Sequence, residues 1–388
     1  MPNKTKPAGI KRTKTIGINV FDAAVKRMAI LYEEGHRVVV NFSAGKDSGV
    51  CLEICILAAQ MTGRLPVEVV MRDEEIMFPG TYEYALRTAE RSEVDFTWLI
   101  AGQPVVNHYN REAPYFWVFD KLVDSADWVR QPPDWATYTD KMNIEAVCSA
   151  DVFPPDEGKE LFGVIGLRVQ ESFLRRGGLM SSGGYLTKPT KNGYRKARPI
   201  YDWVDGDVWK AHNEFGWDYN TAYDTMHMMG IPRWDLRIAP PTLNEFGMRN
   251  LQVASKAWPE WFERVCHRLA GVRSVALFGK TAMRPFKKPQ ETWEACFHRE
   301  CLDDAPTWIQ ERSRRVLDSV LASHKSHASQ PLPELRPCPS CNNDLGAWKK
   351  LTMHMYTGQP FASRIGLPPI EPGFFREGGG TWGGSVTW

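Results

Sequence analysis

The side chains best suited to chemistry gather in one short loop, residues 43–48, which reads Ser-Ala-Gly-Lys-Asp-Ser. Residues 37–42 before it hold three consecutive valines, which is typical of a buried strand, and residues 49–60 after it have the apolar pattern of a buried helix. Between a strand and a helix, backbone N–H groups and the positive end of the helix dipole point at one spot, which suits a phosphate group. The same string also fits an ordinary strand-to-helix turn.

Each residue type in this loop has a use in phosphate binding. Gly45 lets the backbone approach a ligand closely, and Lys46 supplies a mobile charge for phosphate oxygens. Ser43 and Ser48 supply hydroxyls. The loop lacks the longer Gly-x-x-x-x-Gly-Lys-Ser/Thr spacing, so it does not predict a kinase-type phosphate loop.

Two more polar clusters follow expected strands. Strand 67–71 ends in Arg-Asp-Glu-Glu, and strand 161–167 leads into a basic cluster at residues 168–176. Ligands of open α/β sheets bind at the carboxyl ends of strands, so both clusters can face the same crevice as the loop. Asp73 or Glu75 could accept a ribose hydroxyl or hold a metal, and a plain charged loop is the alternative.

The second cluster depends on its backbone conformation. If residues 168–176 are helical, three side chains share a face: Arg168, Ser172 and either Arg175 or Arg176. Two guanidinium groups there would be good phosphate or sulfate ligands, and Glu171 could orient one of them. A surface salt-bridge cluster is the alternative.

The pattern of elements predicts an α/β fold with a doubly wound, mostly parallel sheet and a helical C-terminal region. The further elements expected are helices 19–34, 81–92, 205–215, 221–229, 258–269, 290–300 and 305–324, and strands 96–100 and 198–203. Residues 101–160 have poor periodicity and predict an insertion that partly covers the site. The glycine- and serine-rich residues 177–193 predict a mobile loop.

Composition excludes some classes of protein. The 388 residues carry a net charge of +2, so the overall charge does not indicate a nucleic-acid-binding protein. Residues 1–18 form a basic arm, which is either a solvated tail or a contact for a nucleic-acid or protein partner. No apolar run reaches the length of about 18 residues needed to cross a bilayer, and no signal-peptide core is present. The eight cysteines sit largely in apolar surroundings, which favours a reducing, cytoplasmic location.

One cysteine pair has the spacing of a metal site. Cys338 and Cys341 form a Cys-x-x-Cys unit, which supplies half of the four ligands that zinc needs. Residues that could complete the set are Cys296, His298 and Cys301, although an expected helix separates the two cysteines on its surface. An iron–sulfur cluster, a redox pair and idle buried thiols also remain open, and Cys148 is a thiol without an assigned role.

Four separated segments together resemble one family. They are Ser43–Ser48, Asp73 with Phe78–Thr81, the Gly-x-Arg-x-x-Glu-Ser match at Gly166–Ser172, and Pro199–Trp203 followed by Asp207–Trp209. In this order they are similar to the phosphoadenosine phosphosulfate (PAPS) reductase branch of the ATP-pyrophosphatase, or PP-loop, superfamily. Segments 128–133, 219–220 and 229–232 resemble the subgroup that includes immunoglobulin-binding regulator A, whose relatives include an ATPase of DNA phosphorothioate systems.

The resemblance implies that ATP, or a PAPS-like adenine nucleotide, binds at the strand ends with Mg²⁺. It implies α–β cleavage of ATP, pyrophosphate release and adenylation of an unknown acceptor, in sulfur metabolism or sulfur transfer. The implied nucleotide ligands are Ser43, Ala44, Gly45, Lys46, Asp47, Ser48, Asp73, Glu75, Gly166, Arg168, Glu171 and Ser172. The implied catalytic residues are Lys46, Asp47, Arg168 and Arg176, with Asp47 also a candidate Mg²⁺ ligand. The domain of this kind would cover residues 19–242, followed by a helical region at 243–365 and a glycine-rich tail at 366–388.

Two departures from the family matter. Ala44 stands where the superfamily has glycine, and alanine fits there only if its φ angle stays negative. No cysteine follows Cys341, whereas assimilatory PAPS reductases use a cysteine close to the C-terminus. Thiol-dependent reduction of an adenylylsulfate therefore remains an alternative that requires Cys338 or Cys341. A non-catalytic nucleotide sensor, or a component of a nucleic-acid complex, is the third reading, and the oligomeric state is not predicted.

Overall fold

The computed structural model describes residues 17–107, 109–139, 148–182, 184–190, 193–238, 245–360 and 367–376. These residues form two compact units that alternate along the chain. Unit 1 contains the described residues of 17–72, 84–98 and 148–220, and unit 2 contains those of 73–83, 99–139 and 221–376. The boundaries expected at 242 and 365 stay a prediction, and most of the basic arm and the glycine-rich tail lies outside the described residues.

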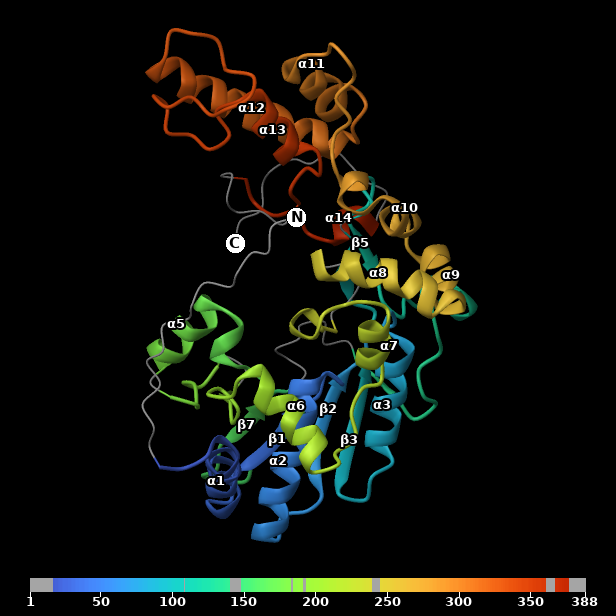
Figure 1. The fold of residues 1–388 in the computed structure, drawn as a ribbon, viewed down its shortest axis with the longest axis vertical. Helices are drawn as coiled ribbons and strands as arrows, with labels where there is room; N and C mark the ends of the chain where they lie inside the picture. Colours follow the sequence, from blue (N-terminus) through green and yellow to red (C-terminus); the bar gives the residue numbers. More distant parts are fainter. Residues whose placement is uncertain are drawn as a thin grey trace. The chain divides into compact units, whose positions relative to one another are not determined.

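A six-stranded sheet organises the fold (Figure 1). Its strand order is β6 (Thr137–Tyr138), β3 (Val94–Ile100), β2 (Val67–Arg72), β1 (Arg37–Asn41), β7 (Leu161–Val164) and β8 (Tyr194–Ala197). The central strand β1 pairs in parallel with β2 and with β7, and β7 pairs in parallel with β8. With helices beside the sheet, this is the doubly wound α/β fold that the sequence predicts.

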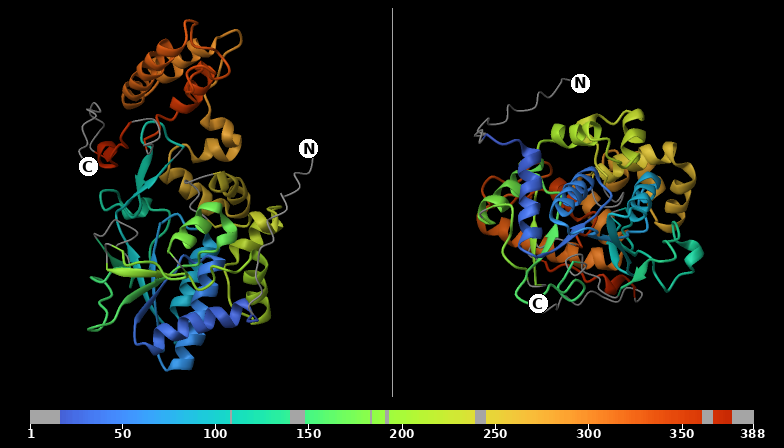
Figure 2. Two further views of the ribbon diagram at one scale, coloured as in Figure 1. Left: turned by 90° about the vertical axis from the view of Figure 1, so that its left-hand side faces the viewer. Right: turned by 90° about the horizontal axis from the view of Figure 1, so that it is seen from below.

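The helices of unit 1 are α1 (Val20–Glu33), α2 (Lys46–Thr62), α5 (Phe173–Ser182) and α6 (Asp205–Glu214), and α3 (Pro79–Ala89) begins in unit 2 and ends in unit 1. α1 begins where the side chain of Asn19 accepts a hydrogen bond from the Asp22 backbone N–H at 2.8 Å, a typical N-cap. α2 is buried along most of its length and ends at Gly63, whose φ is 67°. Figure 2 shows α1 and α2, both blue, side by side.

Residues 198–203 are not the strand expected from their aromatic and β-branched content; the strand β8 lies just before them and they form turns. Asp202 binds Arg27 of α1, with its Oδ1 2.9 Å from the guanidinium. The indole of Trp203 donates to the carbonyl of Val20 at 3.0 Å. This segment therefore holds α1 in place.

Residues 168–176 are not one helix either. A short 3-10 turn covers Val169–Glu171, Ser172 has an extended backbone, and α5 begins at Phe173. The helical face that would unite Arg168, Ser172 and either Arg175 or Arg176 therefore does not exist. α5 also occupies part of the segment 177–193 that was expected to be a loop.

Unit 2 is mainly helical. Its helices are α7 (Ala222–Met228), α8 (Glu245–Ala257), α9 (Pro259–Arg268), α10 (Val272–Phe278), α11 (Trp293–Phe297), α12 (Thr307–His327), α13 (Trp348–Met355) and α14 (Gly373–Arg376). The expected insertion at 101–160 contains a small antiparallel pair, β4 (Pro104–Val106) and β5 (Tyr115–Trp117). A buried apolar cluster that includes Phe297, Ile309, Val316, Leu351 and Met355 joins α11, α12 and α13. In the described part of the chain, none of the helices combines the length and apolarity that a bilayer crossing requires.

Candidate anion-binding site

The loop after β1 is held closed by one serine. The hydroxyl of Ser48 lies 3.2 Å from the Gly45 backbone nitrogen and 3.3 Å from that of Ser43, and it donates to the Gly45 carbonyl at 3.0 Å. Gly45 has an extended backbone and is the N-cap of α2. The Ser48 hydroxyl therefore shapes the loop, while the first turn of α2 presents the N–H groups that have no acceptor within a helix.

Ala44 lies in the left-handed region, with a φ of 52°, so the expectation that its φ stays negative is wrong. An alanine in this region costs roughly 1–2 kcal/mol. The strain is held by the surroundings: Ala44 is fully buried, and its carbonyl accepts a 2.9 Å hydrogen bond from the side-chain amide of the buried Asn220. Alanine suffices here because it has no branch at Cβ.

A second buried side chain holds the next carbonyl of the loop. His212 of α6 is 3% exposed, and its Nε2 lies 3.1 Å from the Lys46 carbonyl oxygen. Burial lowers the pKa of His212, so the ring is neutral and Nε2 carries the proton that it donates. His212 and Asn220 were not predicted as site residues. The one signal in the sequence for Asn220 is that segment 219–220 resembles the subgroup named above.

Two buried cations stand at the start of α2. Lys46 is 5% exposed and Arg168 is 3% exposed. The Arg168 Nε donates to Asp47 Oδ1 at 2.6 Å, and its Nη2 lies 3.4 Å from Asp205 Oδ1. The Lys46 Nζ lies 3.6 Å from Asp47 Oδ2 and 3.7 Å from Asp205 Oδ1. We call Lys46, Asp47, Arg168 and Asp205 the charged cluster.

The charged cluster has the electrostatics of an anion site. A buried cation is costly unless an anion accompanies it, and here two carboxylates fill that role. The distances from Lys46 to both carboxylates are longer than a direct hydrogen bond. Asp205 has a side chain 33% exposed and sits in the first turn of α6, so it is the carboxylate most easily displaced. A phosphate group, with more oxygens and more charge, can take its place beside both cations.

Gly166 brings the chain after β7 against this loop. A Cβ at residue 166 would lie 2.8 Å from the Asp47 carbonyl carbon and 2.9 Å from its oxygen. Only glycine allows this approach, so Gly166 positions the loop, and its role as a nucleotide ligand stays a prediction.

Of the other predicted site residues in segment 168–176, one contacts the charged cluster and two do not. Glu171 faces Arg168, with Oε1 3.5 Å from Nη2, and also binds Arg175. Ser172 caps α5 by accepting from the Arg175 backbone N–H at 3.1 Å. Arg176 is exposed. Within the described residues, neither Ser172 nor Arg176 is among the side chains that contact the charged cluster.

Asp73 and Glu75, in unit 2, are fully buried and already bonded. Glu75 accepts hydrogen bonds from the backbone N–H of Phe119 at 2.6 Å and of Val129 at 3.0 Å, and from Arg268 at 3.0 Å. Asp73 accepts from the Glu75 N–H at 2.9 Å and from Arg130. These carboxylates tie the insertion to α9, and their burial argues against the ribose or metal role expected of them.

The thiols fall into an inert set and one cluster. Burial raises the pKa of six thiols: Cys51, Cys55, Cys148, Cys266, Cys296 and Cys301. Cys148, the thiol without an assigned role, is buried and its pKa is raised to about 12, so it is a packing residue. Cys338 and Cys341 form a group with His324, and the residues that could have completed a zinc site, Cys296, His298 and Cys301, do not belong to this group.

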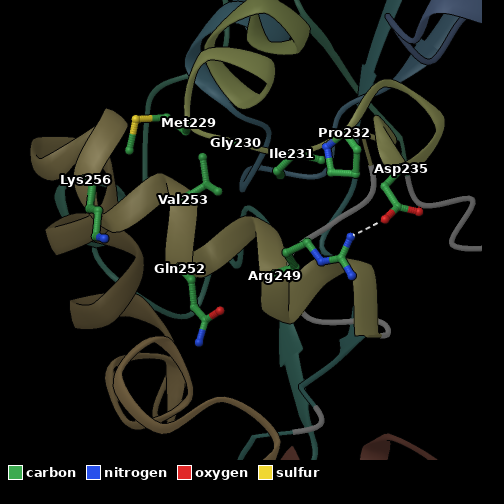
Figure 3. Close-up of a pocket in the computed structure, with 9 residues that line it drawn as sticks. All are labelled: Met229, Gly230, Ile231, Pro232, Asp235, Arg249, Gln252, Val253 and Lys256. Carbon is green, nitrogen blue, oxygen red and sulfur yellow. Dashed lines mark hydrogen bonds and ion pairs between the residues drawn. The ribbon is translucent and has the colours of Figure 1, made fainter. Parts of the chain in front are cut away.

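A separate pocket of about 410 Å³ lies within unit 2 (Figure 3). It is lined by Met229, Gly230, Ile231, Pro232, Asp235, Arg249, Gln252, Val253 and Lys256. Two of the lining side chains are joined, since Arg249 donates to Asp235 at 2.6 Å. None of the residues predicted to bind the nucleotide lines this pocket.

Comparisons with known proteins give distant matches. No family model matches the chain. A protein of Escherichia coli (strain K12) described as "Uncharacterized protein YbdN" is 26% identical over 382 residues, which is 91% of this chain and 92% of that protein.

Among solved structures, Candida glabrata FMN adenylyltransferase in complex with FMN and an ATP analogue matches with a TM-score of 0.33 and 12% identity, over 55% of this chain and 64% of that one. PAPS reductase from Candida auris matches with a TM-score of 0.30 and 15% identity, over 52% of this chain and 84% of that one. The chain thus spans slightly less than two thirds of the adenylyltransferase. At these TM-scores the matches do not decide substrate or reaction, which have to be inferred from this chain's own residues.

Proposed function

We propose that unit 1 binds ATP with its β- and γ-phosphates at residues 43–48 and cleaves it between the α- and β-phosphates, releasing pyrophosphate and adenylating an acceptor. The observation that carries this proposal is the pair of buried cations at the start of α2, Lys46 and Arg168, which are accompanied by two carboxylates. The four-segment resemblance to the PP-loop superfamily supports the choice of an adenine nucleotide and of α–β cleavage.

The chain's own residues would act through an exchange of anions. Phosphate oxygens would displace Asp205 from Lys46 and Arg168, and the first-turn N–H groups of α2 would bind the pyrophosphate. Lys46 would then face the negative charge that grows on the leaving pyrophosphate, and Arg168 the α-phosphate. Arg176, exposed on α5, is a second proposed ligand for the α-phosphate or for an anionic acceptor.

Asp47 fits Mg²⁺ in part. Carboxylate oxygens suit this ion, which is bound in proteins by one or two carboxylates together with substrate phosphates. Both oxygens of Asp47 already face cations of the cluster, at 2.6 Å from Arg168 and 3.6 Å from Lys46. Asp47 would be the residue that holds Mg²⁺, and the ion would supply further neutralisation of the pyrophosphate.

The site offers no obvious general base. His212 donates its Nε2 proton to the Lys46 carbonyl, which occupies the nitrogen nearest the loop. The nucleophile therefore has to come from the acceptor, and an acceptor that is already anionic, such as a carboxylate or a sulfur oxyanion, needs no base.

The experiment measures nucleotide binding and product identity on the full chain. Calorimetry with α,β-methylene-ATP, which cannot be cleaved at the bond in question, should show binding that Lys46→Ala reduces by about tenfold or more. Lys210→Ala is the matched control, because this lysine lies on α6 with a side chain 75% exposed and should bind normally. With ATP and a fraction of cellular small molecules, the expected products are pyrophosphate and an adenylate.

Other outcomes select the alternatives. Release of ADP and phosphate would contradict the proposal. Thiol-dependent sulfite release from PAPS, abolished by Cys338→Ser with Cys341→Ser, would favour the reductase. Binding without any turnover, together with loss of a macromolecular partner when residues 1–15 are deleted, would favour a nucleotide-sensing regulator or a nucleic-acid-associated component.

A further inference from the structure

Three potential metal ligands meet within unit 2, apart from the charged cluster. One ligand atom from each of His324, Cys338 and Cys341 lies within 4.8 Å of the other two. His324 comes from the last turn of α12, and the cysteines come from the loop that precedes α13. Two sulfurs and one imidazole nitrogen form a donor set that suits zinc and other borderline or soft ions.

The hydrogen bonding of the His324 imidazole leaves one ring nitrogen available to a metal. Its Nε2 lies 2.8 Å from the backbone carbonyl of Gln330, so Nε2 carries the proton and donates it. Its Nδ1 is then the nitrogen with the lone pair. His324 is 5% exposed, and Nδ1 is buried with no hydrogen-bond partner. A buried acceptor without a partner is costly, and a carbonyl behind the far nitrogen is the usual support of a ligating histidine.

The loop that carries the cysteines is folded around their sulfurs. The Cys338 N–H donates to the Gly346 carbonyl at 3.1 Å, and Asn342 takes a left-handed backbone with a φ of 43°. A Cβ at residue 346 would lie 3.1 Å from the Cys341 sulfur and 2.9 Å from the Asn343 carbonyl oxygen. This tight turn keeps both sulfurs on the side of His324.

We propose that His324 through Nδ1, and Cys338 and Cys341 through their sulfurs, bind a Zn²⁺ ion in unit 2. In the described part of the chain no fourth histidine, cysteine, aspartate or glutamate belongs to the group, so the fourth position is left to water or an incoming ligand. An iron–sulfur cluster fits less well, because such clusters are held by four cysteines or by two cysteines with two histidines.

The ion would cross-link the end of α12 to the loop before α13. Those two helices carry much of the buried apolar cluster of unit 2, including Ile309, Val316 and Leu351, and lie side by side in Figure 1. Because such a site does not exist in an unfolded chain, the binding free energy of the ion adds to the stability of the fold. An open fourth position also leaves the ion able to bind a small thiol or an anion.

The test uses the full chain, purified under reducing conditions without chelator. Elemental analysis should give about one equivalent of zinc per chain. Cobalt added to the metal-free protein should produce the absorption bands of a tetrahedral site with thiolate-to-cobalt charge transfer. Cys338→Ser, Cys341→Ser and His324→Gln should each lose most of the bound zinc and weaken the cobalt bands.

Two matched variants control for misfolding and for adventitious binding. His327→Gln removes a histidine one turn further along α12, and Cys266→Ser removes a half-buried thiol of α9; both should keep the full metal content. Circular dichroism checks that each variant is folded.

Wild-type protein without zinc and without cobalt thiolate bands would overturn the proposal. So would a Cys338–Cys341 disulfide that persists under reducing conditions, or zinc that remains in all three ligand variants. The readout is metal content, so its failure is distinguishable from failure of the ATP proposal.

Discussion

The loop that opens α2 and the loop that opens α13 use the same backbone devices for different chemistries. Each turns sharply into a helix, each has a non-glycine residue with positive φ, Ala44 or Asn342, and each packs against one glycine, Gly166 or Gly346. The first loop gathers ammonium, guanidinium and carboxylate groups. The second gathers two sulfurs and an imidazole. Hard anions suit the first loop and a thiophilic ion the second.

The two loops also differ in where their partners come from. Asp47 lies more than a hundred residues before Arg168 and Asp205 in the sequence. Asp47 and Arg168 meet because they follow β1 and β7, which are neighbours in the parallel sheet. His324, Cys338 and Cys341 lie within one helix end and the following loop. The first site therefore depends on completion of the sheet, whereas the second depends on a local turn and, in our proposal, on its ion.

The variant with the largest expected effect, Arg168→Ala, tests the site at the loop that opens α2. Arg168→Ala removes the buried guanidinium that faces Asp47 and Asp205 and leaves their carboxylates without it. Breaking such a pair costs about 3 kcal/mol of unfolding free energy, measured by urea denaturation, and should also abolish binding of α,β-methylene-ATP. The zinc content of unit 2 should be unchanged.

Arg175→Ala is the control for Arg168. This arginine binds Glu171 on the same segment but has a side chain 45% exposed, and exposed pairs contribute about 1 kcal/mol or less. Equal losses for the two variants would mean that the charged cluster has no special stability.

The two glycines give the next largest effect. Gly166→Ala drives a methyl group against the Asp47 backbone and should weaken nucleotide binding by about tenfold to a hundredfold, because the loop has to shift. Gly346→Ala presses on Cys341 and should lower zinc affinity by about tenfold to a hundredfold. Each variant should leave the other ligand's affinity unchanged, as measured by calorimetry.

Gly206→Ala is the matched control for both glycines. Nothing lies within 4 Å of a Cβ at this position, which is in the first turn of α6, next to Asp205. It should bind both ligands normally. Parallel losses of nucleotide and zinc in either of the other two variants would show that the sites are not independent.

The sequence predicted the parts of the fold that local patterns encode. The valine run of β1, the loop and the apolar helix α2 could be placed because strand, turn and helix preferences agreed over consecutive residues. The edge strand β8 was misplaced because its sequence, Tyr194–Ala197, contains Arg195 and Lys196, while the more apolar turn after it has the composition of a strand.

The site was harder to predict than the fold. Asp205, His212 and Asn220 reach the loop from more than 150 residues away, and no local pattern announces such contacts. The place of Glu75 after a strand makes it a candidate ligand, but the sequence does not show that its carboxylate is already bonded to backbone N–H groups. His324 was missed for a similar reason, since it lies outside any cysteine motif.

Substitutions at the two residues with positive φ, Ala44 and Asn342, should have smaller effects on stability and compare the backbone strain of the two loops. A β-branched residue is unfavourable at positive φ, so Asn342→Val should cost roughly 1–2 kcal/mol of unfolding free energy. Ala44→Val should cost more, because residue 44 is fully buried and the extra methyl groups have no space. Thermal unfolding measures both.

Ala44→Gly is the control for the strain argument. Relief of strain and loss of a buried methyl group oppose each other, so stability should change by less than about 1 kcal/mol. A large stabilisation would mean that packing around the Ala44 methyl contributes little, and a large loss would mean that its φ is not strained.

The smallest expected effect concerns His212 and the pH dependence of the unfolding free energy, and it appears only below neutral pH. Burial lowers the pKa of this ring below the ordinary value of 6.5, so the unfolded chain binds a proton more readily than the folded one. The stability contributed by neutral His212 is complete above about pH 6.5 and is lost as the pH falls toward the lowered pKa. His212→Gln, whose amide can still donate to the Lys46 carbonyl, should therefore flatten the fall of unfolding free energy below that pH.

His354→Gln in unit 2 is the control. Burial lowers the pKa of His354 as well, so this variant should also flatten the fall of unfolding free energy with pH. At neutral pH both variants should bind the nucleotide as the wild type does, because the amide that replaces His212 keeps the hydrogen bond to the Lys46 carbonyl; a large loss of binding in His212→Gln alone would mean that the imidazole ring itself is needed to shape the loop.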